Sequence, residues 1–219
     1  MSNIGKKQIK KALAIVVSVL LVGVLGGCSS ILPKQKEASH IYRLSIPTSS
    51  GQSFTAGPVI NLSLPSAPHA LNGTDIVLSP DGRRLTAAAG AVWAEPVPAQ
   101  FRRAFLDAIA ADGAMRGVIP QGGTNAQYWL NVDIREFEAV FDQGEDQAPL
   151  VTTHIVLNLT QTGTRKLLGT RDLSSQSRAS ARRISSIVEA QDEATQKVLR
   201  DAVDWLKSMT GVLPKPDRS

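Results

Sequence analysis

The sequence predicts one domain of the α/β class, in which helices pack on a β-sheet. Apolar and polar residues alternate along residues 126–141 and 151–161, which is the two-residue period of half-buried strands. Apolar residues recur at three- and four-residue steps within 98–112 and 184–209, which is the period of an amphipathic helix. The alternative is an α+β fold, in which an antiparallel meander carries two helices.

A short apolar segment near the N-terminus ends at the only cysteine, Cys28. Lysines precede it, and the run Ala12–Leu25 is interrupted only by Ser18 and Gly23. A helix of this length spans about 21 Å, against about 30 Å for a bilayer core, so the length favours a cleaved signal peptide over residues 1–27. The alternative is an uncleaved single-span anchor in which Cys28 has no special role.

The residues around the cysteine add a chemical prediction. Leu25-Gly26-Gly27-Cys28 is similar to the lipobox of bacterial lipoproteins, with small residues directly before the cysteine. This similarity implies that Cys28 is acylated, with palmitate among its chains, and becomes the mature N-terminus. Cys28 is therefore the predicted lipidation site, and the exported part has no disulfide to form.

Removal of the predicted signal peptide lowers the net positive charge of the chain. The whole chain has 24 Lys+Arg and 19 Asp+Glu, and four of the lysines but no acidic residue precede Cys28. The mature part therefore carries 20 basic against 19 acidic residues, a net charge of +1. Nucleic-acid binding needs a clustered basic face, so we expect no nucleic-acid partner.

The first half of the mature chain is predicted to contain short strands. Residues 28–39 are polar and aperiodic, which predicts a flexible tether before a domain over 40–210. Strands are predicted at His40–Ile46, Val59–Leu64 and Asp75–Ser79. Ser79-Pro80-Asp81-Gly82 favours a turn, because Pro fixes φ and Gly tolerates positive φ, and it predicts a hairpin with Arg84–Ala87.

The second half is predicted to contain longer elements. A helix begins near Pro98, which suits a first turn, and ends at Gly113. The clearest strand, Ala126–Phe141, loses its alternation at Glu136-Phe137, which indicates a bulge. Strands at Val151–Gln161 and Arg165–Ser174 complete a meander, a helix covers Ile184–Met209, and residues 211–219 form a disordered tail.

Two tryptophans are the candidate partner-binding residues, Trp93 and Trp129. Indoles are common both in cores and at interfaces, so the sequence leaves both locations open for each. Asp133, Glu136 and Glu138 form a possible carboxylate set, but a solvated and partly charge-paired strand face is the favoured interpretation.

No motif of an enzyme is present. The three histidines lie outside any HExxH pattern, and no serine lies in a G-x-S-x-G elbow. We therefore expect no catalytic residue, metal or cofactor, and His154 is interpreted as a polar residue of a strand face. Arg182-Arg183, with Arg178 nearby, is a short basic patch for which an ordinary polar helix entry is favoured over contact with anionic lipids.

Several segments together resemble the ABC-type transport auxiliary lipoprotein family, whose best-known members are the PqiC-like lipoproteins of Gram-negative envelopes. The resemblance spans about residues 40–209, and its most specific parts are the tryptophan before the first helix and the strand that ends in Arg-Glu-Phe-Glu. The segments that carry it are Tyr42-Arg43-Leu44, Asp75-Ile76-Val77-Leu78, Ala91-Val92-Trp93-Ala94-Glu95-Pro96, Tyr128-Trp129-Leu130-Asn131-Val132-Asp133-Ile134-Arg135-Glu136-Phe137-Glu138 and Trp205-Leu206.

The resemblance implies a fold and a function. The family fold is similar to an anticodon-binding-like three-layer domain, with helices packed on a mixed sheet. The implied function is that of a non-enzymatic periplasmic lipoprotein beside an MCE-type ABC system that moves lipids between the two membranes. The implied partners are MCE-type transporter subunits, the membrane through the lipid anchor, and further copies of the chain.

Two points remain open at this level. Ser29, directly after Cys28, resembles the sorting pattern for the outer membrane, which predicts the periplasmic face of that membrane, with the inner membrane as the alternative. An envelope lipoprotein that serves as an assembly pilot or scaffold, without lipid transport, is the second functional hypothesis. A periplasmic hydrolase, with a site formed by residues distant in sequence, is the third.

Overall fold

The computed structural model describes residues 39–45, 56–120 and 125–211. The signal peptide, Cys28, most of the tether and the tail from residue 212 onward lie outside these ranges. Within them, no helix is both long enough and apolar enough to cross a membrane.

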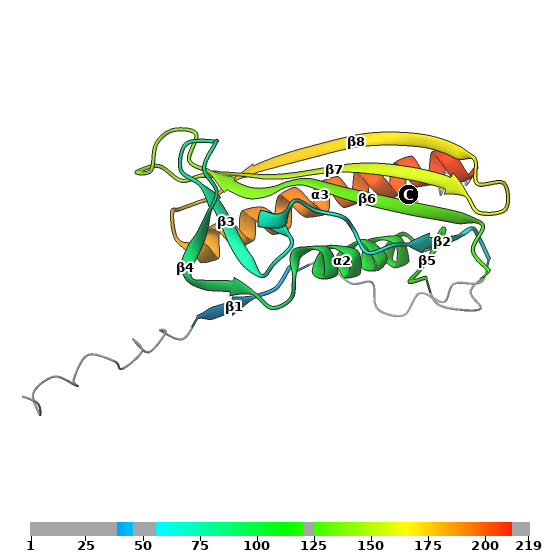
Figure 1. The fold of residues 1–219 in the computed structure, drawn as a ribbon, viewed down its shortest axis with the longest axis horizontal. Helices are drawn as coiled ribbons and strands as arrows, with labels where there is room; N and C mark the ends of the chain where they lie inside the picture. Colours follow the sequence, from blue (N-terminus) through cyan, green and yellow to red (C-terminus); the bar gives the residue numbers. More distant parts are fainter. Residues whose placement is uncertain (1–38, 46–55, 121–124, 212–219) are drawn as a thin grey trace, which may run out of the picture. The chain divides into compact units, whose positions relative to one another are not determined.

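In the described ranges, eight strands form one mixed sheet (Figure 1), as the α/β prediction with packed helices expects. Two α-helices, α2 (Val97–Asp112) and α3 (Ile184–Thr210), and one 3-10 turn, η1 (His69–Leu71), accompany it. The strands are β1 (His40–Tyr42), β2 (Val59–Leu62), β3 (Asp75–Ser79), β4 (Thr86–Trp93), β5 (Arg116–Val118), β6 (Tyr128–Val140), β7 (Leu150–Gln161) and β8 (Leu167–Arg178).

The long strand β6 lies inside the sheet and pairs with other strands along both of its own edges. On one edge, β7 runs antiparallel to it from Tyr128 opposite Gln161 to Val140 opposite Leu150, and β8 continues the meander. On the other edge, β2 and β3 run parallel to the start and the end of β6, with a single bridge from Ser66 to Asp133 between them. The segment 59–79 therefore runs alongside β6, and its strands β2 and β3 point in the same direction as β6.

The outer strands extend this arrangement at the two ends of β6. Beyond β3 lie β4, which is antiparallel to it, and then β1, which is parallel to β4. Beyond β2 lies β5, again parallel. The predicted hairpin after β3 is confirmed, although its second strand, β4, spans Thr86–Trp93 rather than the predicted Arg84–Ala87. The parallel pairs join segments that are distant in sequence, so the spacing of residues gives no sign of them.

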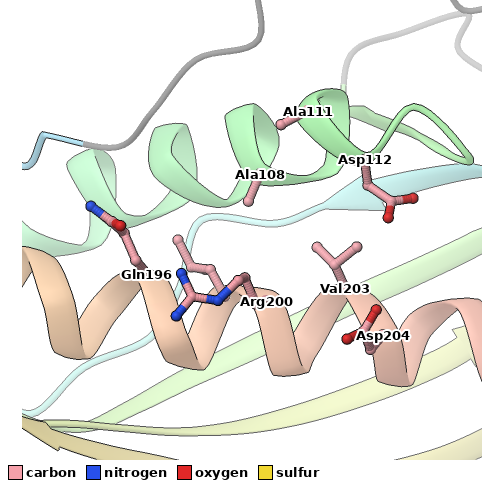
Figure 2. A pocket seen from close by; sticks show the side chains of 8 residues that line it. Ala108, Ala111, Asp112, Gln196, Arg200, Val203 and Asp204 are labelled. Carbon is pink, nitrogen blue, oxygen red and sulfur yellow. The ribbon is translucent and has the colours of Figure 1, made fainter. Parts of the chain in front are cut away.

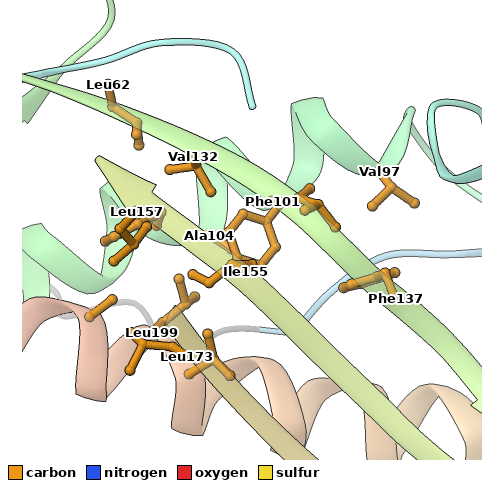
Figure 3. Close-up of a cluster of buried hydrophobic side chains, with 14 of the residues drawn as sticks. Leu62, Val97, Phe101, Ala104, Val132, Phe137, Ile155, Leu157, Leu173 and Leu199 are labelled. Carbon is orange, nitrogen blue, oxygen red and sulfur yellow. The ribbon is translucent and has the colours of Figure 1, made fainter. Parts of the chain in front are cut away.

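Both helices pack against one face of the meander and form the core with it (Figure 3). Phe101 of α2, Ile155 of β7 and Leu199 of α3 belong to one cluster and are at most 1% exposed. Each large apolar side chain buried in this way stabilises the fold by about 1.5–3 kcal/mol. The stripe predicted on each helix is therefore its core-facing side.

The boundaries of α2 follow from two residues. Pro98 lies in the first turn, where the missing N–H costs no helical hydrogen bond. Gly113 has φ 75°, and its N–H donates to the carbonyl oxygen of Ile109, which closes the helix in a left-handed cap. Both predicted boundaries are confirmed.

Some predicted elements differ in extent. The bulge of β6 lies between Ile134 and Glu136, one residue before the predicted slip, and β8 continues to Arg178, four residues beyond its predicted end. In the second half of β8 the inward-facing positions after Leu173 are Ser175 and Ser177, so the segment alternates in burial but lacks the apolar alternation that marks a strand in a sequence. The three-residue strand β5 was not predicted, because Arg116-Gly117-Val118 is too short to show a period.

Candidate interaction surface

The face of the sheet opposite the helices carries polar side chains from β6, β7 and β8. We call this the polar sheet face. It arises because alternate residues of each strand point away from the core, so that Asn131 lies opposite Asn158 and Glu136 opposite His154. Its members are Trp129, Asn131, Asp133, Glu136 and Glu138 of β6, Thr152, His154, Val156, Asn158 and Thr160 of β7, and Thr170, Asp172, Ser174 and Gln176 of β8.

Trp129 lies at one end of the polar sheet face and is only partly buried. Its indole N–H donates to Ser63 Oγ at 2.6 Å and to Asn131 Oδ1 at 3.2 Å. The hydroxyl of Ser63 in turn donates to Asn131 Oδ1 at 3.2 Å. These three hydrogen bonds fix the orientation of the ring, so Trp129 presents a rigid amphipathic surface to solvent.

The carboxylates of the polar sheet face are engaged by neighbouring side chains. Asp133 pairs with Arg135 at 2.7 Å and accepts a hydrogen bond from Ser66 Oγ at 2.9 Å. Among the described residues, Glu138 forms no salt bridge, and its burial, with the nearby charge of Glu136, raises the pKa of the Glu138 carboxyl. The prediction of a partly charge-paired face is therefore confirmed for Asp133.

His154 connects all three strands of the meander. Its Nε2 lies 2.8 Å from an oxygen of Asp172 on β8, and its Nδ1 lies 3.9 Å from Glu136 on β6. Within the described residues, no group of three or more His, Cys, Asp or Glu side chains is arranged to hold a metal ion. His154 is thus a polar residue of a strand face, as predicted.

Trp93 lies in the core rather than on the surface. Its side chain is 3% exposed and its ring lies 5.9 Å from that of Phe137, with an angle of 60° between the planes. The candidate role of Trp93 as a partner-binding residue is therefore corrected, because a side chain this deeply buried is not accessible to a partner. Sequence spacing did not reveal this, since the neighbour Phe137 is 44 residues away.

The basic residues before α3 are largely neutralised. Arg178 makes two hydrogen bonds to the carboxylate of Asp142, at 2.6 and 2.8 Å, and a third to the carbonyl of Ala148. Arg182 lies 3.6 Å from Asp146. The acidic loop between β6 and β7 thus pairs with Arg178 and Arg182, while Arg183 donates a hydrogen bond to Ser185 in the first turn of α3, as in an ordinary polar helix entry.

A groove of about 400 Å³ lies between α2 and α3 (Figure 2). Small and apolar side chains form its floor, including Ala108, Leu199 and Val203, while Arg200 and Asp204 lie at its rim. Lys207 of α3 donates to Asp112 of α2 at 2.8 Å and ties the two helices together. The groove therefore separates two helices whose spacing is held by an ion pair.

Several solved structures are similar to this fold, among them the following two. Protein XCC0632 from Xanthomonas campestris superposes with a TM-score of 0.67 and 19% identity, over 78% of this chain and 96% of that one. A second, uncharacterised protein gives a TM-score of 0.63 and 15% identity, over 78% of this chain and 99% of that one. At these identities the similarity establishes the fold alone.

Sequence comparison gives the family. No curated protein matches the chain. A family model does match, described as the ABC-type transport auxiliary lipoprotein component, and it covers residues 42–203, from the end of β1 to the last third of α3. That range includes Trp93, the whole of β6 and the polar sheet face. The chain therefore belongs to the ABC-type transport auxiliary lipoprotein family.

Proposed function

We propose that this protein is a non-enzymatic, lipid-anchored periplasmic component of an MCE-type ABC system, and that it supports lipid transport between membranes and envelope integrity. The observation that carries the proposal is the family match over residues 42–203, which makes the chain an auxiliary lipoprotein of ABC-type transport. Three parts of the proposal go beyond the family match: the partner is an MCE system, the cargo is a lipid, and the anchor lies at the periplasmic face of the outer membrane.

The polar sheet face supports a role in docking. It lies on the side of the meander opposite α2 and α3, and Trp129 is held on it by hydrogen bonds to Ser63 and Asn131. Rigid tryptophans are enriched among the residues that dominate binding energies at protein interfaces. We propose that Trp129 contacts a transporter subunit while acyl chains on Cys28 hold the domain at the membrane.

Copurification tests this function. The tagged protein is extracted from envelopes with mild detergent, and its partners are identified by mass spectrometry. We expect MCE subunits and the associated ATPase. Recovery of secretin, pilus or cell-wall components without MCE subunits supports the alternative of an assembly pilot or scaffold and contradicts lipid transport.

Variants of Trp129 locate the surface. Trp129→Ala is expected to reduce recovery of MCE subunits at least tenfold, because it removes the aromatic anchor. The control is Arg200→Ala, an exposed position on the helical side, which should leave recovery unchanged. Equal recovery with both variants would place the interface elsewhere. Deletion of the gene and of each transporter gene should also give the same envelope-permeability defect.

A further inference from the structure

The polar sheet face divides into a neutral half and an acidic half. In the neutral half, Trp129 lies opposite Thr160, and Thr160 lies opposite Leu167, so one row of side chains crosses all three strands of the meander. The next row consists of neutral polar residues, Asn131, Asn158 and Thr170. Neither row contains a charged residue, so this half combines an aromatic ring and an aliphatic side chain with amide and hydroxyl groups.

The neutral half offers both an apolar contact and a hydrogen-bond donor. Leu167 is 55% exposed and shares its row with the partly buried Trp129. Asn158 accepts a hydrogen bond from Thr170 Oγ1 at 2.7 Å through its Oδ1, so its amide nitrogen is the group that stays free. This nitrogen has no hydrogen-bond partner among the described residues and is not buried. It is therefore available to donate to a partner.

The acidic half follows along the same strands. Glu136 of β6 lies opposite His154, and His154 Nε2 lies 2.8 Å from a carboxylate oxygen of Asp172 on β8. The side chains of Glu136 and Asp172 are 49% and 68% exposed, and neither forms a salt bridge with Lys or Arg among the described residues. Arg135, the one arginine of β6, is paired with Asp133 at 2.7 Å. Apart from His154, these two exposed carboxylates therefore lack a counter-charge.

Further charges at the two ends of the polar sheet face increase the contrast between its halves. The turn between β7 and β8 places the exposed residues Arg165 and Lys166 next to the neutral half. At the other end Glu138 adds a third carboxylate, whereas Arg178 and Arg182 are already paired with the acidic loop. A partner is therefore attracted in one orientation, with its positive charge over the acidic half. An anionic lipid surface has the wrong charge for this half.

We propose that the polar sheet face binds an extended segment of a partner protein, with an apolar side chain against Trp129 and a Lys or Arg between Glu136 and Asp172. Six residues of β7 separate Thr160 from His154, so these two groups of the partner lie about 20 Å apart. An extended segment also has free backbone carbonyls that can accept from Asn158, whereas the carbonyls of a helix are used internally.

This inference rests on the proposed docking role of the polar sheet face and adds the chemistry of the partner. The rigid Trp129 supplies affinity through the apolar contact, since tryptophans dominate many interfaces. The carboxylates supply orientation and rate of association, since complementary charges steer the encounter. A partner with Asp or Glu at the same position is rejected.

The indole N–H of Trp129 is itself a reporter of binding. In ¹H–¹⁵N spectra of the full-length protein in neutral detergent micelles, its signal is the indole signal missing from the Trp129→Phe variant. The probe is the peptide Ac-Leu-Gly-Ser-Gly-Ser-Gly-Lys-NH₂, in which Leu and Lys are about 20 Å apart when extended. We expect it to shift this signal saturably. With Glu in place of Lys, the peptide should bind about tenfold more weakly at low salt, and the difference should shrink at about 0.15 M salt.

Substitutions that remove charge locate the acidic half. Glu136→Gln combined with Asp172→Asn should abolish most of the difference between the Lys and Glu peptides. The matched control is Glu189→Gln combined with Asp201→Asn, which removes two exposed carboxylates from α3 and should leave the difference unchanged. A Trp129 signal that does not respond to the Lys peptide would overturn the proposal. A Lys preference that persists without Glu136 and Asp172 would do the same.

Other occupants of the face give other results. A Trp129 signal that responds to phosphatidylglycerol vesicles but not to the Lys peptide would overturn the proposal in favour of a lipid surface. A shift that depends on protein concentration alone would overturn it in favour of a second copy of the chain. Copurification remains a separate test, since failure to recover MCE subunits contradicts the proposed function but leaves the measured preference for Lys intact.

Discussion

Gln191 of α3 donates a hydrogen bond of 2.7 Å to the hydroxyl of Thr153 on β7, and both side chains are buried. The hydroxyl of Thr153 also lies 3.1 Å from that of Thr195, one helical turn further along α3. This small polar cluster lies between the meander and its covering helix, among buried apolar side chains such as Ile155 and Leu199. It fixes the position of α3 along the strand, because sliding would break both hydrogen bonds.

Loss of the central hydroxyl should destabilise the domain. Thr153→Val is nearly isosteric but leaves Gln191 and Thr195 without their partner, so it should lower the free energy of unfolding by about 1–3 kcal/mol. The measurement is urea denaturation followed by circular dichroism. In a double-mutant cycle with Gln191→Leu, the double variant should lose less than the sum of the two single variants. Simple additivity would show that the hydrogen bond contributes nothing.

Trp93→Ala should be among the most damaging substitutions. It removes a side chain that is 3% exposed and packs against Phe137, so we expect a loss of about 3–5 kcal/mol in unfolding free energy. Trp129→Ala is the matched control, because Trp129 is partly exposed and should cost clearly less. Equal losses in thermal or urea denaturation would contradict the assignment of Trp93 to the core and Trp129 to the surface.

Asp192 should make stability depend on pH. Burial raises the pKa of its carboxyl from 3.8 to about 6, against the opposing hydrogen bond from Ser45 and with help from the charge of Glu189. Because the folded state then holds the proton more tightly than the unfolded state, this group stabilises the fold below about pH 4, and that contribution is lost as the pH rises through 6.

Asp192→Asn tests this dependence, since asparagine resembles the neutral acid at every pH and still accepts from Ser45. The variant should have a higher Tm than the parent protein at pH 7.5, and the difference should shrink at pH 5. Glu193→Gln, at a neighbouring exposed position, serves as the control and should show no such trend. A constant difference between the Asp192→Asn variant and the parent across this range would refute the shifted pKa.

Gly117 of β5 packs closely against side chains of α2. A Cβ atom there would lie 2.7 Å from Leu106 Cδ2 and 3.2 Å from Ile109 Cδ1, and Ile109 is fully buried. Gly117→Ala should therefore cost about 1–3 kcal/mol in urea denaturation. At Gly163 a Cβ would meet no atom within 4 Å, so Gly163→Ala should be nearly neutral. If the two substitutions had the same effect, the close approach would be disproved.

Cys28→Ser tests the anchor. Burial of acyl chains stabilises membrane association by about 0.8 kcal/mol per CH₂, so the variant should move from the membrane fraction to the soluble fraction. Its circular dichroism should match that of the parent protein, because the predicted tether separates Cys28 from the domain. Metabolic labelling with palmitate should mark the parent protein alone. A labelled, membrane-bound variant would contradict lipidation at Cys28.

Much of the fold was accessible from local patterns. β3, the start and end of α2, the two faces of β6 and the start of α3 follow from two- and three-to-four-residue periods and from Pro and Gly at specific positions. β5 and the end of β8 were not accessible, because the first is too short to show a period and the second has serines, Ser175 and Ser177, at its inward-facing positions. Family membership could also be predicted from the sequence, because segments that carry the resemblance lie within the range that the family model matches.

The features of the candidate sites also fall into those that the sequence predicts and those that only the fold reveals. Residue type and spacing were sufficient to predict the class of the fold and the polar character of one face of β6, and also the net charge expected for the chain after removal of the predicted signal peptide. The location of Trp93 in the core and of Trp129 at the surface became visible only in the fold, as did the burial of Gln100 with no hydrogen-bond partner among the described residues. Burial and hydrogen bonding depend on residues that are far apart in the chain, and parallel pairing with β6 brings those residues together.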